Sequence, residues 1–175
     1  MPIKPILFNT EMVRAILDGR KSCTRRIIKG FIPKDAQFGY TAFTPHGSIS
    51  CRGVFENEGY GEKFFKLPYQ IGDILYVRET WHKGLERYIY RADYSDTEKF
   101  YQGGKEINMK WHPSIHMPKE AARIFLRVTN VRVERLQDIT VEDALAEGMD
   151  KYIRWDANPW VWGIEFERCE KPEGV

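Results

Sequence analysis

Apolar and polar residues alternate most regularly between residues 123 and 134 of this chain. From Leu126 onward, leucine and valine residues alternate with polar or charged ones, a two-residue period that is typical of a strand with one buried face. Shorter apolar runs predict four further strands, at residues 3–8, 73–79, 88–91 and 160–168.

A helical spacing occurs near the N-terminus. Four apolar residues share one face of an amphipathic helix: Met12, Val13, Ile16 and Leu17. Thr10 suits the N-cap position, and Gly19 suits the left-handed backbone conformation that ends many helices. A short helix between these two residues is therefore predicted.

A second helix is predicted to begin at Thr140. Asp143 follows three positions later, as in a capping box, and Ala144 and Leu145 continue the pattern. Gly148 is expected to end this helix after about two turns.

Two segments interrupt these elements. Residues 29–70 and 94–117 contain scattered glycine, proline and aromatic residues, and both are predicted to be long loops or hairpins inserted into a compact core. The chain is therefore expected to form a single domain, residues 1–175, of the α+β class. Its predicted core is a mostly antiparallel, barrel-like sheet with two short helices.

The composition of the chain restricts the classes of protein to which it can belong. Hydrophobic residues make up 42% and charged residues 30%, and the net charge of +2 is too small to indicate nucleic-acid binding by itself. No apolar stretch approaches the length of a membrane span, and the N-terminus has no signal-peptide pattern, so no membrane partner is expected. Cys23, Cys51 and Cys169 are odd in number and widely spaced, which fits a reducing cytoplasm.

Charged and polar side chains are most concentrated just after Gly19, where four cations, two hydroxyls and a thiol occupy residues 20–26. Such a concentration of donors at the end of a helix suits an anionic or polar ligand, although a solvated basic turn has the same composition. The cations are Arg20, Lys21, Arg25 and Arg26.

Lys21 and Thr24 stand three positions apart and would face the same way if this segment were helical or a tight turn. A lysine that burial or neighbouring cations have freed of its proton can activate a threonine hydroxyl as a nucleophile. The alternative is that the two side chains only pair with a carboxylate and cap a turn. Glu147, in the last turn of the second helix, is unfavourably placed against the helix dipole and would gain from a cation such as Lys21.

For the remaining candidate residues, a structural role is favoured over a functional one. Arg78 and Glu79 end a predicted strand and form a surface ion pair in the simplest interpretation. Trp160 and Trp162 share one face of the last strand, where core packing is favoured over base stacking. His112 and His116 have a metal-ligand spacing, but neighbouring prolines break the helix that such a pair needs, so no metal is predicted.

Gly19-x-Lys21 followed by Arg26 resembles the G-x-K-x-x-x-x-R signature of the ASCH domain, a relative of the PUA fold. The turn at Gly72 and Asp73, the helix before Gly148 and the last strand occur in the order of that family. The resemblance covers most of the chain apart from the two insertions. It implies a small β-barrel with helices at its mouth and a pocket near the G-x-K segment.

Within that family, a compact bacterial branch hydrolyses N4-acetylcytidine without a cofactor. It uses a lysine and a threonine of a G-R-K-T-x-T motif and a glutamate of the later helix. Lys21, Thr24 and Glu147 look like the matching catalytic residues, while Ser22 replaces the first threonine of the motif. The two insertions are absent from the compact enzymes, and the chain is also similar to ASCH proteins of phages and prophages.

Three functions remain open at this point. The first is hydrolysis of an acylated cytidine at Lys21, Thr24 and Glu147. The second is a non-catalytic RNA-binding module, and the third is a ribonuclease, which no particular residue supports. A nucleoside or RNA is the expected partner. Its binding residues would be Arg20, Ser22, Arg25, Arg26, Arg78, Glu79 and Trp160.

Overall fold

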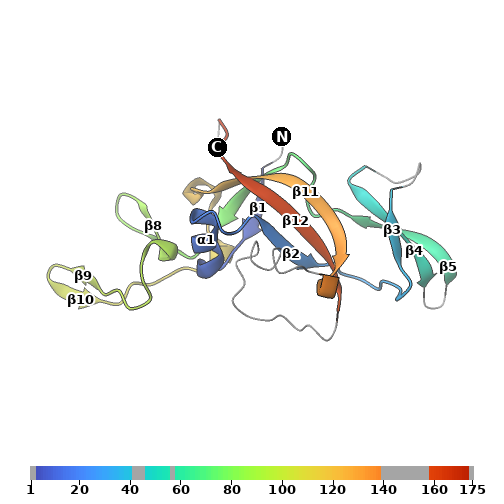
Figure 1. The fold of residues 1–175 in the computed structure, drawn as a ribbon. Coiled ribbons are helices and arrows are strands. Elements are labelled where there is room, and N and C mark those ends of the chain that lie inside the picture. The colour runs from blue at the N-terminus through green and yellow to red at the C-terminus, as the bar shows by residue number, and fades with distance from the viewer. Residues whose placement is uncertain (1–2, 41–45, 56–57, 139–157, 174–175) are drawn as a thin grey trace.

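The computed structural model describes residues 3–40, 46–55, 58–138 and 158–173. Its central element is a five-stranded sheet in the order β1-β6-β11-β12-β2 (Figure 1). Strand β1 runs parallel to β6, and the other three neighbouring pairs are antiparallel. The strands are β1 (Ile3–Leu7), β2 (Cys23–Ile27), β6 (Ile74–Arg78), β11 (Phe125–Arg135) and β12 (Trp160–Cys169).

The predicted strands at both ends of the chain and in its middle are confirmed, with bounds shifted by at most two residues. Strand β11 contains a register shift between Val128 and Asn130. At this point two polar residues, Thr129 and Asn130, follow each other in the sequence, so the bulge returns Val131 to the buried face. Strand β2 was not predicted, because Cys23–Ile27 has no alternation of apolar and polar residues.

The central sheet is covered on both faces. Its larger face packs against α1 (Thr10–Leu17) and buries Val13 and Ile16 of that helix among Leu75, Leu126 and other apolar residues. Its other face carries a smaller cluster, in which Ile74 and Phe125 meet the partly looped segment around Met117. Burial on two sides explains why β6, in the interior of the sheet, is apolar at four successive positions, residues 74–77.

Helix α1 confirms the predicted amphipathic segment with one correction. Its N-cap is Asn9, whose side chain accepts a hydrogen bond from the backbone N–H of Met12, and Thr10 is the first helical residue. Gly19 has a φ of 75°, as expected of the glycine that follows a helix. The predicted second helix, with Thr140 and Glu147, lies outside the described residues.

The first insertion, predicted as loops or hairpins, is a three-stranded antiparallel sheet in the order β3-β4-β5. Its strands are β3 (Gln37–Gly39), β4 (Ser48–Phe55) and β5 (Gly59–Lys66). Ile49 is buried in the main core, and Phe38 and Phe65 pack against that core. The segment is therefore part of the folded domain.

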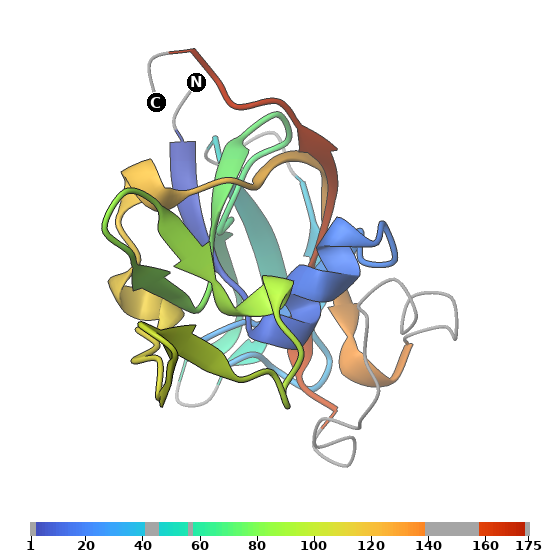
Figure 2. The ribbon, with the colours of Figure 1, turned by 90° about the vertical axis from the view of Figure 1, so that its left-hand side faces the viewer.

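Two small hairpins project from the opposite end of the molecule (Figure 1). The hairpin of residues 100–107 lies within the second predicted insertion, residues 94–117, and the hairpin of residues 81–90 precedes it. Figure 2 shows α1 beside the turn η1 that joins the two hairpins. The strands are β7 (Trp81–Lys83), β8 (Tyr88–Tyr90), β9 (Phe100–Gln102) and β10 (Lys105–Ile107). The short 3-10 turns are η1 (Arg91–Asp93), η2 (Ser114–His116), η3 (Lys119–Ala121) and η4 (Leu136–Asp138).

The α+β class and the mostly antiparallel pairing are confirmed, but the described sheet is not a closed barrel. Strands β1 and β2 are its two edges and do not pair with each other. Between them, Nη2 of Arg26 donates a hydrogen bond to the carbonyl oxygen of Leu7 at 2.8 Å. A side chain therefore satisfies an acceptor at the place where a backbone ladder would have closed the barrel.

Candidate functional site

Lys21 is buried directly after α1. The backbone N–H groups of Arg20 and Lys21 both donate to the carbonyl oxygen of Ala15, which turns the chain back toward the sheet. The Lys21 residue is only 4% exposed. Its Nζ donates a 2.6 Å hydrogen bond to the carbonyl oxygen of Cys23 and lies 5.5 Å from the centre of the Phe8 ring. Lysines are rarely buried to this extent, so the position is a candidate functional site.

Thr24 lies in β2 opposite Ile164 and is 2% exposed. Since opposite residues of a ladder share one face of a sheet, Thr24 points to the same core face as Ile164. Arg26 shares this face, and its guanidinium lies 5.7 Å from the centre of the Phe8 ring. Thr24 lies in an extended strand, so the helical spacing under which Lys21 and Thr24 would face the same way does not occur. Both side chains are nevertheless buried at the junction of α1 and β2.

Arg20 and Ser22 are exposed in the turn that leads to β2. Arg20 forms an ion pair with Asp18 at 2.9 Å, and both side chains are more than half exposed. Such a surface pair stabilises a fold little and leaves Arg20 able to exchange its partner for a ligand.

Arg25 points to the opposite face of the sheet. Its side chain is 2% exposed, and its Nε donates to Oε1 of Glu134 at 2.6 Å. Arg132 binds the other oxygen of Glu134 at 2.9 Å. Glu134 thus reaches from β11 to β2 across the intervening strand, where Gly163 leaves room for it. Arg25 is therefore held in a structural ion pair, away from Lys21.

We expect Gly163→Ala to lower the free energy of unfolding by about 1–3 kcal/mol. A Cβ at this position would lie 2.7 Å from Oε1 of Glu134 and 3.1 Å from Cγ of Arg132, and the ion pair with Arg25 restricts any shift. Urea unfolding monitored by circular dichroism measures the change. The matched control is Gly39→Ala, in a strand position with no atom within 4 Å; an equal loss in both variants would contradict this explanation.

Arg78 and Glu79 do not form an ion pair with each other. Arg78 donates to the carbonyl oxygens of Ile115 and Met117, while Glu79 is 1% exposed and binds Arg123 through both oxygens at 2.9 and 3.0 Å. Burial raises the pKa of Glu79 above its ordinary value, and the hydrogen bond and charge of Arg123 offset part of the rise. Arg78 therefore anchors the end of the second insertion to β6, while Glu79 and Arg123 join the segment after β6 to the segment before β11.

Arg123 also connects two other elements. It forms an ion pair with Asp93 of η1 and stacks over the Tyr90 ring at 3.9 Å. Glu79, Arg123 and Asp93 thus form one connected group of ion pairs.

Trp160 packs at the far end of β2, where its carbonyl oxygen accepts the N–H of Ile28. Its ring meets Phe38 edge-on at 4.9 Å, and Arg135 lies over it at 4.2 Å. Trp162 is buried in the main core. Trp162 is therefore a core residue, and Trp160 is partly buried and packs against the same core.

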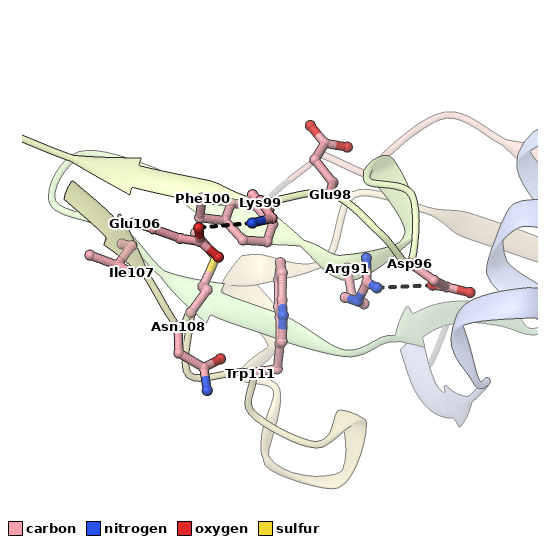
Figure 3. Close-up of a pocket in the computed structure, with 10 residues that line it drawn as sticks. Arg91, Asp96, Glu98, Lys99, Phe100, Glu106, Ile107, Asn108 and Trp111 are labelled. Atoms are coloured by element: carbon pink, nitrogen blue, oxygen red, sulfur yellow. Dashed lines mark hydrogen bonds and ion pairs between the residues drawn. The ribbon is translucent and has the colours of Figure 1, made fainter. Parts of the chain in front are cut away.

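A cavity of about 640 Å³ lies beside the β9–β10 hairpin and is lined by that hairpin and the segments that flank it, between residues 91 and 111. Figure 3 shows the Trp111 ring within it, with the Lys99–Glu106 ion pair on one side and the Arg91–Asp96 ion pair on the other. Each cation of the lining is matched by a carboxylate, so the cavity has no excess of positive charge. Neither Lys21 nor Thr24 lines it.

The structure thus brings Lys21 and Arg26 to the Phe8 ring, buries Thr24 on the sheet face that Arg26 shares, and places Arg25 on the opposite face. The predicted catalytic residue Glu147 lies outside the described residues. Sequence reasoning missed Phe8, whose only signal is its place at the end of a short apolar run, and Glu134 and Arg123, which no local pattern marks. Within the described ranges, no cluster of three metal-ligating side chains occurs.

No protein-family model matches the chain, and no curated protein or solved structure matches it either. In the part of the chain that the structure describes, every helix is too short or too polar to cross a membrane.

Proposed function

We propose that the chain is an ASCH-type domain that recognises acetylated cytidine and hydrolyses its N4-acyl amide, with Thr24 as nucleophile and Lys21 as its base. One observation carries this proposal. The buried Nζ of Lys21 lies 2.6 Å from the Cys23 carbonyl oxygen, which belongs to the peptide bond that joins Cys23 to Thr24. This contact holds the amine beside the backbone of a buried threonine, and the proposal is that it reaches the Thr24 hydroxyl and activates it.

The reaction balances with these groups. Oγ1 of Thr24 attacks the amide carbonyl carbon while the neutral amine of Lys21 takes the hydroxyl proton. The C–N bond then breaks, the leaving amine accepts a proton, and cytidine departs from an acyl ester on Thr24. Water hydrolyses the ester and releases acetate. Glu147 would orient Lys21 or protonate the leaving amine, and the two residues can exchange these roles.

The distribution of cations favours a nucleoside over an RNA backbone. Arg25 is buried against Glu134, and Lys21 is buried against Cys23 and Phe8. Two of the four cations that would bind phosphates are thus withdrawn from the surface. A ligand smaller than an RNA strand requires fewer exposed cations.

The second candidate is a non-catalytic RNA-binding module. It is supported by the exposure of Arg20, Ser22 and Arg26 within one short segment of the chain. Binding of single-stranded RNA would weaken steeply with salt, with a slope of about −0.7 per phosphate contact. Hydrolysis of a free nucleoside would depend little on salt.

The proposal is tested by incubating the protein with N4-acetylcytidine and measuring the release of cytidine and acetate. Thr24→Val keeps the shape of the buried residue and is expected to abolish turnover, because it removes the nucleophile. Thr24→Ser retains the hydroxyl and is expected to keep measurable turnover. Thr129→Val, an exposed strand threonine, is the matched control. Turnover of Thr24→Val at the wild-type rate would reject the mechanism.

A further inference from the structure

Strand β5 is the outer strand of the first insertion. It pairs with β4 along one edge, and among the described residues no strand pairs with its other edge. Figure 1 shows β5 at the outer end of the molecule. An uncovered edge of eight residues presents backbone donors and acceptors to which another strand can bind.

We propose that two copies of this chain associate through their β5 strands, antiparallel and centred on Phe64. In this register Glu62 of each copy faces Lys66 of the other, and the two Phe64 side chains face each other. The arrangement follows from sequence spacing, because Glu62 and Lys66 lie two positions before and two positions after Phe64. A two-fold axis through Phe64 therefore matches each negative charge with a positive one.

Other registers lack this complementarity. Pairing centred on Glu62 or on Lys63 would set two like charges directly opposite, which is destabilising. Pairing centred on Gly61 would set Glu62 opposite Tyr60 and Lys63 opposite Gly59. Lysines on an edge strand usually discourage pairing. Here the spacing of Glu62 and Lys66 lets the positive charge of Lys66 in one copy meet the negative charge of Glu62 in the other.

The exposed apolar side chains of the same face provide surface to bury. Phe64 is 43% exposed and Tyr60 71%, and Val54, directly opposite Tyr60 in β4, is 55% exposed. Arg52 holds Glu62 at 3.0 Å and fixes the carboxylate on this face. Aromatic residues facing each other across a strand pair stabilise it further.

The proposal is tested by light scattering coupled to size exclusion over a series of protein concentrations. The wild type is expected to form dimers. Glu62→Lys and Lys66→Glu each turn both attractive pairs into repulsive ones and are expected to weaken the dimer roughly tenfold or more. A 1:1 mixture of the two variants restores both attractive pairs and is expected to dimerise again.

Three outcomes would overturn the proposal: a wild type that stays monomeric at every concentration, single variants that dimerise as well as the wild type, and a mixture that stays monomeric. Lys83→Glu makes the same charge change at an exposed residue of β7, outside the first insertion, and is expected to dimerise normally. Hydrolysis by the monomeric variants separates this proposal from the proposed function, since Lys21 lies outside the first insertion.

Discussion

Lys21→Met is expected to slow release of cytidine from N4-acetylcytidine by about 10²–10⁴-fold, the range that a positioned general base contributes. Methionine matches the length of lysine and suits a site that is 4% exposed, so the fold is expected to remain intact. The variant removes the amine next to Thr24 and leaves the hydroxyl in place. Single-turnover kinetics with excess protein measure the loss.

The matched control is Lys105→Met, an exposed strand lysine in the second insertion, which is expected to turn over at the wild-type rate. A thermal unfolding curve of Lys21→Met separates loss of chemistry from loss of fold. Wild-type turnover by a folded Lys21→Met protein would show that this lysine is not the base. Glu147 would then be the candidate base.

Arg123→Met is expected to lower the free energy of unfolding by about 3–5 kcal/mol at neutral pH, as is typical when one partner of a buried ion pair is removed. Glu79 is 1% exposed and would keep its charge without the guanidinium that binds both of its oxygens. Arg87→Met, at an exposed position between β7 and β8, is expected to change stability little. Denaturant unfolding compares the two variants.

The loss in Arg123→Met is expected to shrink in acid. Burial raises the pKa of Glu79 in the folded protein above its ordinary value of 4.5. A carboxyl with a raised pKa binds a proton more tightly in the folded state, so its cost to stability is full above that pKa and disappears as the pH falls toward 4.5. Removal of Arg123 raises the pKa further and makes this dependence steeper.

A second substitution tests the same cause at neutral pH. Glu79→Gln in the Arg123→Met background removes the buried charge and is expected to recover part of the lost stability. If the double variant were less stable than Arg123→Met, packing of the arginine against Tyr90 would account for the loss instead.

Local patterns were sufficient to predict much of the central fold. Alternating residues predicted β11, although the phase change at Thr129 became a bulge only when β12 paired with it. The apolar face predicted α1, and Gly19 marked its end, because left-handed backbone is favourable for glycine. These features depend on neighbours within a few positions along the chain, which the sequence displays directly.

The candidate site could be predicted only in part. The motif after Gly19 indicated Lys21 and Thr24 as site residues, but it did not show which of its four cations are buried and which are exposed. Strand β2 exists because Cys23–Ile27 pairs with β12, and this pairing places Arg25 and Thr24 on opposite faces of the sheet. A long-range pairing of this kind leaves no periodic signal in five residues.

The sequence by itself determined the helix, the alternating strands and the concentration of cations and hydroxyls that follows Gly19. Only the tertiary structure decided that the first insertion is a sheet with an open edge, that the described central sheet stays unclosed, and that Arg25 is neutralised by Glu134. The physical reason is that burial and charge pairing join residues such as Arg25 and Glu134, which are 109 positions apart. Such partners are selected by packing and not by local propensity.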